Sequence, residues 1–428
     1  MAINYPNQVQ KKRLSATISY LLSAIVFAIL GFVFLGLDMP ALAERITMSP
    51  LTLATIHTII LGFMLTVAYG VSYQVIPIAF QAPALPRHVL YWHLPAHLLS
   101  VCIMIAGFLI SDWSIVGIGG TLLLAAFLAY VTVAQISFRK AKNKTPVHRH
   151  LVLPMLSLFL VMLFGLWMAF GLPGSSVDTL LTHVTLGAFG FWLGLVMVIS
   201  YKFIPMFALS HGYKASLPIA IRVYYAGIAL VTIADLISIP IHDGLRIAGA
   251  SLMAIGVTKF AWDSDSILKA RKRKKMVLPL RLALFATTCL MVSAIVLTAS
   301  LAFHLSELVE FFAYFMLVFG FTPLIFSYMQ KIVPFLWYEY RFSHHKDRKT
   351  APALDDMIPK DSIYWAIGIY HAGAILGLMT LIFAPILPIG SIISTIGLLA
   401  GLLCAAGTLG LSTALYRVLT IGGPRIDD

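Results

Sequence analysis

His57-Thr-Ile-Ile-Leu-Gly62, running on through Ser72-Tyr73-Gln-Val-Ile-Pro77, is the stretch that decides how this chain is built. A second copy reads His183-Val-Thr-Leu-Gly187 and runs on to Ser200-Tyr201-Lys202-Phe-Ile-Pro205. Each copy begins with an imidazole inside an apolar span. A group that can bind a metal or a proton is rarely placed there without a function.

A fainter third copy has Glu307 and Glu310 near its start in place of the histidine, and it ends at Gln330-Lys331-Ile-Val-Pro334. The copies begin roughly 125 residues apart, a spacing that predicts internal repeats. The expected repeats cover residues 16–138, 150–262 and 279–417.

Composition indicates an integral membrane protein. The chain is 60% hydrophobic and 11% charged, with a mean hydropathy of +0.92. Apolar runs of bilayer-spanning length predict twelve helices. We therefore expect an all-α polytopic protein, 1–428 forming one membrane domain of three four-helix blocks. The runs lie near 16–37, 51–79, 89–110, 113–137, 151–171, 180–209, 217–241, 244–262, 279–302, 306–336, 363–386 and 389–417.

The loop charges predict the orientation. Lys and Arg gather before the first helix and in alternate loops, at 11–13, 139–149, 269–275 and 341–349. The other loops carry Asp38, Glu44, Asp112, Asp178, and Asp243 with Arg246. Basic loops stay in the cytoplasm, so both termini are expected there, in a multi-pass protein of the cell inner (plasma) membrane. The net charge of +13 then reflects contact with anionic lipid and not with nucleic acid.

Polar side chains within the spans are the candidate ligands. His57 and His183 fall within the first two turns of helices two and six, in the expected outer half of the membrane, and Glu310 has a comparable depth. His93 and His97, one turn apart on helix three, share a helix face nearer the cytoplasm. His371 on helix eleven is expected at a similar inner depth.

Each histidine has two interpretations. A neutral imidazole can bind a metal, or it can hydrogen-bond a neighbouring helix as a packing residue. A glycine follows both His57 and His183 by about one turn. It would admit a flat porphyrin beside the imidazole, but small residues also allow close helix contact.

The pattern His57-x4-Gly62-Phe63 … Gly70-Val-Ser-Tyr73-Gln-Val-Ile-Pro77, in a twelve-helix chain with cytoplasmic termini, resembles helix two of the haem-copper oxidase catalytic subunit. The similarity is greatest to the shorter cbb3-type oxidases and nitric oxide reductases. It implies that His57 ligates a low-spin haem b. His183, His371, His97 and His93 are the further cofactor candidates.

The chain also departs from that family. Helix seven, at 217–241, has no histidine pair, and helix ten lacks the family's two histidines separated by one residue. Copper and the oxygen-reducing centre are therefore expected to be absent. Leu209-Ser-His211-Gly212 is faintly similar to the glycine–histidine motif of a membrane haem-copper protein family linked to nitric oxide response.

The leading hypothesis is a haem-binding membrane protein in electron transfer or in respiratory or nitric oxide stress physiology. Its expected partners are membrane lipids and a respiratory electron donor or partner subunit. One alternative is a metal- or proton-coupled transporter whose site combines His57, His183 and Glu310. Another is a structural subunit whose histidines only pack.

Overall fold

The computed structural model describes residues 7–46, 48–236, 242–272, 276–303, 309–342, 351–386 and 390–422. These residues form helices and turns without a β-strand, apart from an isolated bridge between Ser210 and Arg271. Twelve helices within the described ranges are long and apolar enough to cross a membrane, as predicted.

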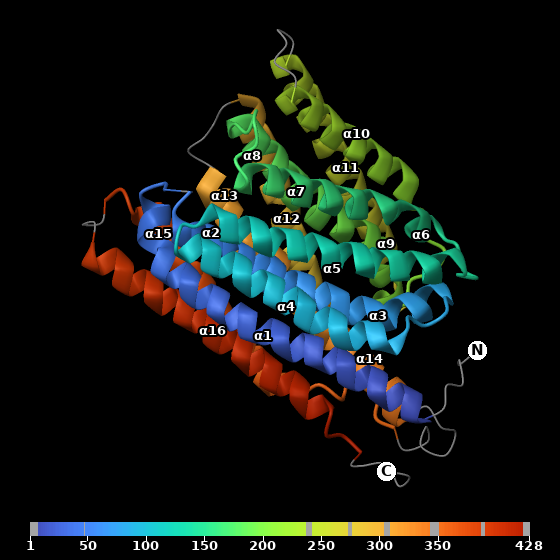
Figure 1. Ribbon diagram of the computed structural model, residues 1–428. Helices are drawn as coiled ribbons and strands as arrows, with labels where there is room; N and C mark the ends of the chain where they lie inside the picture. The colour runs from blue at the N-terminus through green and yellow to red at the C-terminus, as the bar shows by residue number, and fades with distance from the viewer. Residues whose placement is uncertain are drawn as a thin grey trace. The chain divides into compact units, whose positions relative to one another are not determined.

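Nine of the twelve spans contain a single long helix. Their bounds are α1 Asn7–Ala43, α4 Arg87–Leu109, α5 Trp113–Arg139, α7 Val152–Ala169, α10 Leu217–Leu236, α11 His242–Lys269, α12 Leu278–Phe303, α15 Lys360–Phe383 and α16 Ser391–Val418 (Figure 1). A short helix, α6 Pro146–His150, directly precedes α7.

The three spans that carry the repeated motif have a different build. Each has a π-helical segment between two α-helical parts. Helix two consists of α2 Pro50–His57, η1 Thr58–Leu65 and α3 Thr66–Phe80. Helix six consists of α8 Val177–Val184, η2 Thr185–Leu193 and α9 Gly194–Ala208. Helix ten consists of α13 Val309–Phe315, η4 Met316–Phe321 and α14 Thr322–Arg341.

The helices group into two compact units. The first unit comprises Met1–Ser111, Ala126–Ala141 and Leu324–Asp428, and the second comprises Asp112–Ala125 and Lys142–Pro323. The first half of α5 therefore counts with the second unit and its remainder with the first. The predicted division into three consecutive four-helix blocks does not coincide with these units.

Within the first unit, α1 packs antiparallel along almost the whole of helix two. Along the contact, the residue numbers of the facing positions increase on α1 and decrease on helix two by nearly the same amount, so the register is maintained. Small residues allow this close approach, because a methyl group on each of the three glycines would overlap the facing side chain. The facing pairs are Tyr20 with Gly70, Phe27 with Gly62, Gly31 with Ile59, and Asp38 with Thr52.

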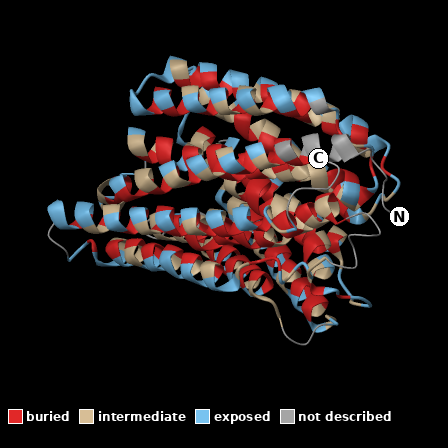
Figure 2. Cartoon of the chain, turned by 90° about the horizontal axis from the view of Figure 1, so that it is seen from below, coloured by how far each residue is buried: buried red, intermediate tan, exposed pale blue. Residues whose placement is uncertain are grey.

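A different face of α1 from those that pack on helix two and α16 is apolar and open. Leu22, Val26, Leu30 and Leu37 are 37–63% exposed and follow one another at helical spacing. Figure 2 shows exposed and buried residues alternating in this way along the helices. A continuous exposed apolar stripe suits contact with lipid tails.

The structure places four of the charged residues predicted in the acidic loops inside helices: Asp38, Asp178, Asp243 and Arg246. Asp38 lies inside α1 and is only 2% exposed. Its Oδ1 accepts hydrogen bonds from the hydroxyl groups of Thr52, at 3.0 Å, and Ser49, at 3.3 Å, which replace water around the carboxylate. Asp243 and Arg246 lie in the first turns of α11. The prediction therefore ended these helices too early, because it assigned charged residues near a helix end to the loop.

One packing detail recurs in all three interrupted spans. A glycine in each π segment faces the membrane helix that precedes it in sequence. The contacts join Gly62 to Phe27, Gly190 to Ser157 and Gly320 to Leu290. The helix pairs α10–α11 and α15–α16 also share a packing scheme, in which Gly227 and Gly373 lie against main-chain atoms of the partner helix. These local likenesses agree with a repeat, although repetition of whole four-helix blocks stays a prediction.

Candidate functional site

His57 is the last residue of α2, directly before the π segment η1. Its Nδ1 donates a hydrogen bond to the carbonyl oxygen of Leu53 at 2.8 Å, since a carbonyl can only accept. The ring centroid lies 4.7 Å from that of Phe108 on α4. Because Nδ1 carries the hydrogen, the lone pair of the neutral ring is on Nε2. This is the tautomer and the carbonyl partner found behind metal-binding histidines.

His183 and His371 have the same tautomer as His57. Nδ1 of His183 donates to the carbonyl oxygen of Val161 on α7 at 2.9 Å, and its ring lies against Gly165. Nδ1 of His371 donates to the carbonyl oxygen of Ile367 at 2.8 Å. In both residues the lone pair is again on Nε2.

The structure places His371 at a different level from the one expected. Tyr370, its neighbour, contacts Phe32 on α1 at a ring separation of 5.5 Å. Phe32 is adjacent to Gly31, which faces Ile59 just beyond His57. His93, in contrast, forms a hydrogen bond with Tyr20. Tyr20 precedes Phe32 by twelve residues on α1, which is about 18 Å along the helix axis. His371 therefore lies near the level of His57 and away from that of His93. The expected common inner layer was wrong because the level of a residue on helix eleven depends on how that helix packs against α1.

The glycines that follow the two repeat histidines do not leave a porphyrin-sized gap. A methyl group on Gly62 would come within 2.3 Å of the Phe27 ring, so that side chain already occupies the space. A methyl group on Gly187 would come within 3.3 Å of Val161. Close helix packing, the alternative interpretation, explains both glycines.

His93 and His97 lie in a buried polar cluster of the first unit. Both are 0% exposed, and their rings stack at 6.1 Å with an interplanar angle of 16°. Four tyrosines from three helices surround them: Tyr20 from α1, Tyr69 and Tyr73 from α3, and Tyr130 from α5. We call these six residues the His–Tyr cluster.

Three hydrogen-bond contacts hold the two imidazoles in place. The Tyr20 hydroxyl lies 2.9 Å from Nδ1 of His93. Nε2 of His97 lies 3.2 Å from the carbonyl oxygen of Leu61 and 2.9 Å from Oγ1 of Thr66. A π segment leaves some carbonyl groups without their usual helical partner, and a membrane offers no water to replace it. His97 thus satisfies a carbonyl of η1.

In the second unit, carbonyl groups of the π segment η2 are satisfied in the same way, with tyrosines in place of histidine. The Tyr224 hydroxyl donates to the Phe189 carbonyl at 2.9 Å, and the Tyr225 hydroxyl donates to the Gly190 carbonyl at 2.5 Å. Helices three and seven therefore serve equivalent structural roles. This favours a hydrogen-bonding role for His97 over ligation.

The tyrosines of the cluster did not emerge from the sequence reasoning. A usable signal was present, because Tyr69 and Tyr73 are four residues apart, as are His93 and His97. Two such pairs on consecutive membrane helices each form one polar aromatic face. In an apolar bundle, polar faces of this kind are expected to pack against each other in the interior.

The described residues provide no support for the predicted metal site. Among the residues that the structure describes, no group of three or more His, Cys, Asp or Glu side chains is gathered as a metal ion would require. His57 belongs to the first unit, whereas His183 and Glu310 belong to the second, so their common site stays a prediction. His304 and Glu307 lie outside the described residues.

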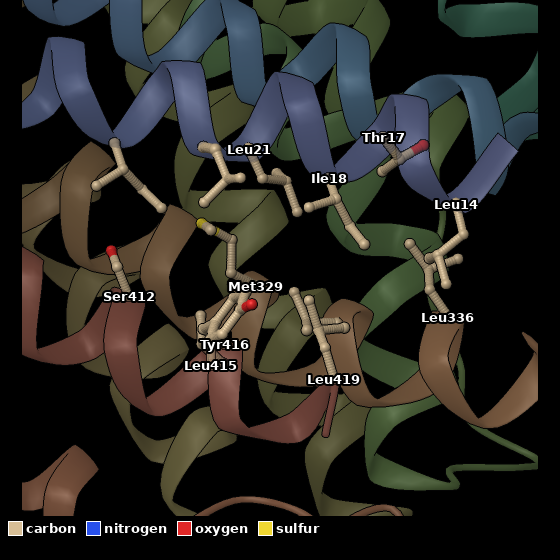
Figure 3. Close-up of a pocket in the computed structure, with 13 residues that line it drawn as sticks. Leu14, Thr17, Ile18, Leu21, Met329, Leu336, Ser412, Leu415, Tyr416 and Leu419 are labelled. Carbon is tan, nitrogen blue, oxygen red and sulfur yellow. The ribbon is translucent and has the colours of Figure 1, made fainter. Parts of the chain in front are cut away.

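Two cavities lie apart from the histidines. A crevice of about 40 Å³ between α1, α14 and α16 is lined almost entirely by apolar side chains, with Thr17, Ser412 and Tyr416 as its polar members (Figure 3). It has room for only a few water-sized groups. A wider groove of about 610 Å³ in the second unit is bordered by Tyr213, Lys214, Ala215, Ser216, Lys259, Trp262 and Asp263.

Comparison with known proteins adds no relative, because no protein-family model and no curated protein matches this chain. The resemblance to the haem-copper oxidases therefore stays a prediction, and the functional argument depends on the site itself.

Proposed function

We propose that this chain is a haem-binding membrane protein in which His57 would hold the haem iron. The observation that carries the proposal is the hydrogen bond from Nδ1 of His57 to Leu53, directly before a π segment. It orients the ring and puts the lone pair on Nε2. π-helical turns are frequent at functional sites.

His371 is the second ligand that the geometry favours. It belongs to the same compact unit as His57, lies near the same level, and has the same tautomer. Aromatic rings continue through this layer, with Phe63 against Phe326 at 5.8 Å and Phe326 against Tyr370 at 5.4 Å. An apolar aromatic surrounding and two neutral imidazoles are the donor chemistry that an iron porphyrin requires. His183, His93 and His97 are the weaker candidates.

A bound haem would supply one-electron chemistry at its iron. The chain's own contribution would be ligand orientation and the exclusion of water. The carbonyl groups of Leu53 and Ile367 hold the two rings, and the surrounding phenylalanines keep the layer dry. The function proposed on this basis is electron transfer in respiratory or nitric oxide stress physiology, without a copper-containing oxygen-reducing centre.

The test is an optical spectrum of the purified chain, reduced minus oxidised, after expression with haem supplied. We expect a Soret band at stoichiometric intensity that is lost in His57→Ala, because that variant lacks the imidazole that would hold the iron. His371→Ala should change the band position or abolish it.

His150→Ala is the matched control. Its Nδ1 donates to the Pro146 carbonyl at 2.8 Å with the same one-turn geometry, but it lies in α6 at the end of a span. The control should keep the wild-type spectrum. A folded wild-type protein without porphyrin would overturn the proposal, and stoichiometric metal in that protein would favour the transporter instead.

A further inference from the structure

Four polar atoms of the His–Tyr cluster lack a hydrogen-bond partner within the described part of the chain. They are the hydroxyl groups of Tyr69 and Tyr73, Nε2 of His93 and Nδ1 of His97. The four residues are at most 4% exposed. The carbonyl group of Ala126 on α5 approaches His93, and the Tyr20 hydroxyl approaches that of Tyr73, but neither contact has normal hydrogen-bond geometry.

The rings that carry the four atoms lie close together. The Tyr69 ring meets both imidazoles edge-on, at 4.7 Å from His93 and 5.2 Å from His97. The Tyr73 ring lies 6.2 Å from His93. Unpaired polar groups in an apolar interior are costly, and a membrane span has no bulk water to relieve that cost.

The hydrogen-bond types of these atoms are complementary. The two acceptors beside Nε2 of His97 assign the ring hydrogen to that nitrogen, which leaves Nδ1 as an acceptor. Each phenol can donate one hydrogen bond and accept others. Buried water molecules bind where a donor and an acceptor are too far apart to bond directly. Such a water makes about three hydrogen bonds to groups that would otherwise be unsatisfied.

We propose that the His–Tyr cluster is a binding site for internal water. The water joins Tyr69, Tyr73, His93 and His97 into one hydrogen-bonded network between α3 and α4. Tyr20 extends the network, since its hydroxyl reaches Nδ1 of His93 at 2.9 Å and the Leu90 carbonyl at 3.4 Å. A network of this kind lets a proton pass between the imidazoles. The inference does not depend on haem.

Tyrosine-to-phenylalanine variants distinguish a hydrated cluster from a dry one. In a dry cluster, Tyr69→Phe and Tyr73→Phe remove an unsatisfied hydroxyl and should raise the unfolding temperature. In a hydrated cluster they remove a bonded hydroxyl, and the unfolding temperature should fall. We expect a fall at least as large as that of Tyr130→Phe, whose hydroxyl donates to Ser72 at 2.8 Å.

Tyr416→Phe, at a 57% exposed position, is the control and should leave the unfolding temperature unchanged. The measurement uses the full chain in detergent. Infrared spectra in H₂¹⁶O and H₂¹⁸O should also show shifted O–H bands of internal water in the wild type, and the Tyr69→Phe/Tyr73→Phe double variant should lose them. A rise or no change in unfolding temperature, or wild-type spectra without such bands, would overturn the proposal.

Discussion

Replacing Asp263 with alanine is expected to lower the free energy of unfolding by about 2–4 kcal/mol. Asp263 on α11 is 1% exposed. It accepts hydrogen bonds from the Tyr201 hydroxyl at 2.7 Å and the Ser216 backbone N–H at 3.0 Å, and it forms an ion pair with Lys259. Its loss leaves all three donors without their acceptor. The lower end of the range applies if Lys259, which is 34% exposed, recovers hydration.

Asp265→Ala is the matched control, two residues along the same helix. Asp265 is 61% exposed and pairs with Lys269, which is 76% exposed, so solvent screens the pair. We expect a change within about 0.5 kcal/mol. Unfolding of both variants in mixed micelles with increasing denaturing detergent measures the difference. Equal effects at the two positions would show that the contacts of Asp263 do not stabilise the second unit.

Gly227→Ala is expected to have a comparable effect, about 2–3 kcal/mol, through overpacking. A methyl group there would lie 2.5 Å from the Gly249 carbonyl oxygen and 2.7 Å from the Met253 nitrogen. Both are main-chain atoms, so α10 and α11 have to separate to admit it. Gly373→Ala should behave similarly, because the methyl group would lie 2.5 Å from the Ala400 carbonyl oxygen on α16.

Gly244→Ala on α11 controls for the intrinsic effect of alanine. No neighbouring described atom would come within 4 Å of the added methyl group. Because alanine favours helix over glycine, the variant should be neutral or up to about 1 kcal/mol more stable. Thermal unfolding followed by far-ultraviolet circular dichroism compares the three variants. A tolerated Gly227→Ala would mean that the α10–α11 contact is looser than described.

The sequence predicted the membrane class and the span count, because hydropathy over about twenty residues depends on composition alone. It failed at Asp38, whose charge suggested a loop while the hydroxyl groups that solvate it lay in another helix. It also missed the π segments, because their widened turns leave hydropathy unchanged. The level of His371 could not be read from its own span, since it depends on the Phe32 contact.

The candidate site was predicted in part. The position of His57 two turns into helix two followed from the motif, whereas its bond to Leu53 and the packing of Phe27 on Gly62 required coordinates. The pairing of tyrosines with His93 and His97 was not predicted, although the four-residue spacing of both pairs indicates it. Which of their atoms remain unpaired depends on tautomers and helix register, and these are tertiary properties.

The π segments also bear on how these helices tolerate insertion and deletion. A π turn holds one more residue than an α turn without forming a loop. Removing a single residue from Thr58–Leu65 would let the helix close into regular α geometry. His57 would then turn around the helix axis relative to Tyr69 and Tyr73, and Leu61 would no longer need His97. In these three helices, adding or removing one residue therefore changes which side chains face the interior.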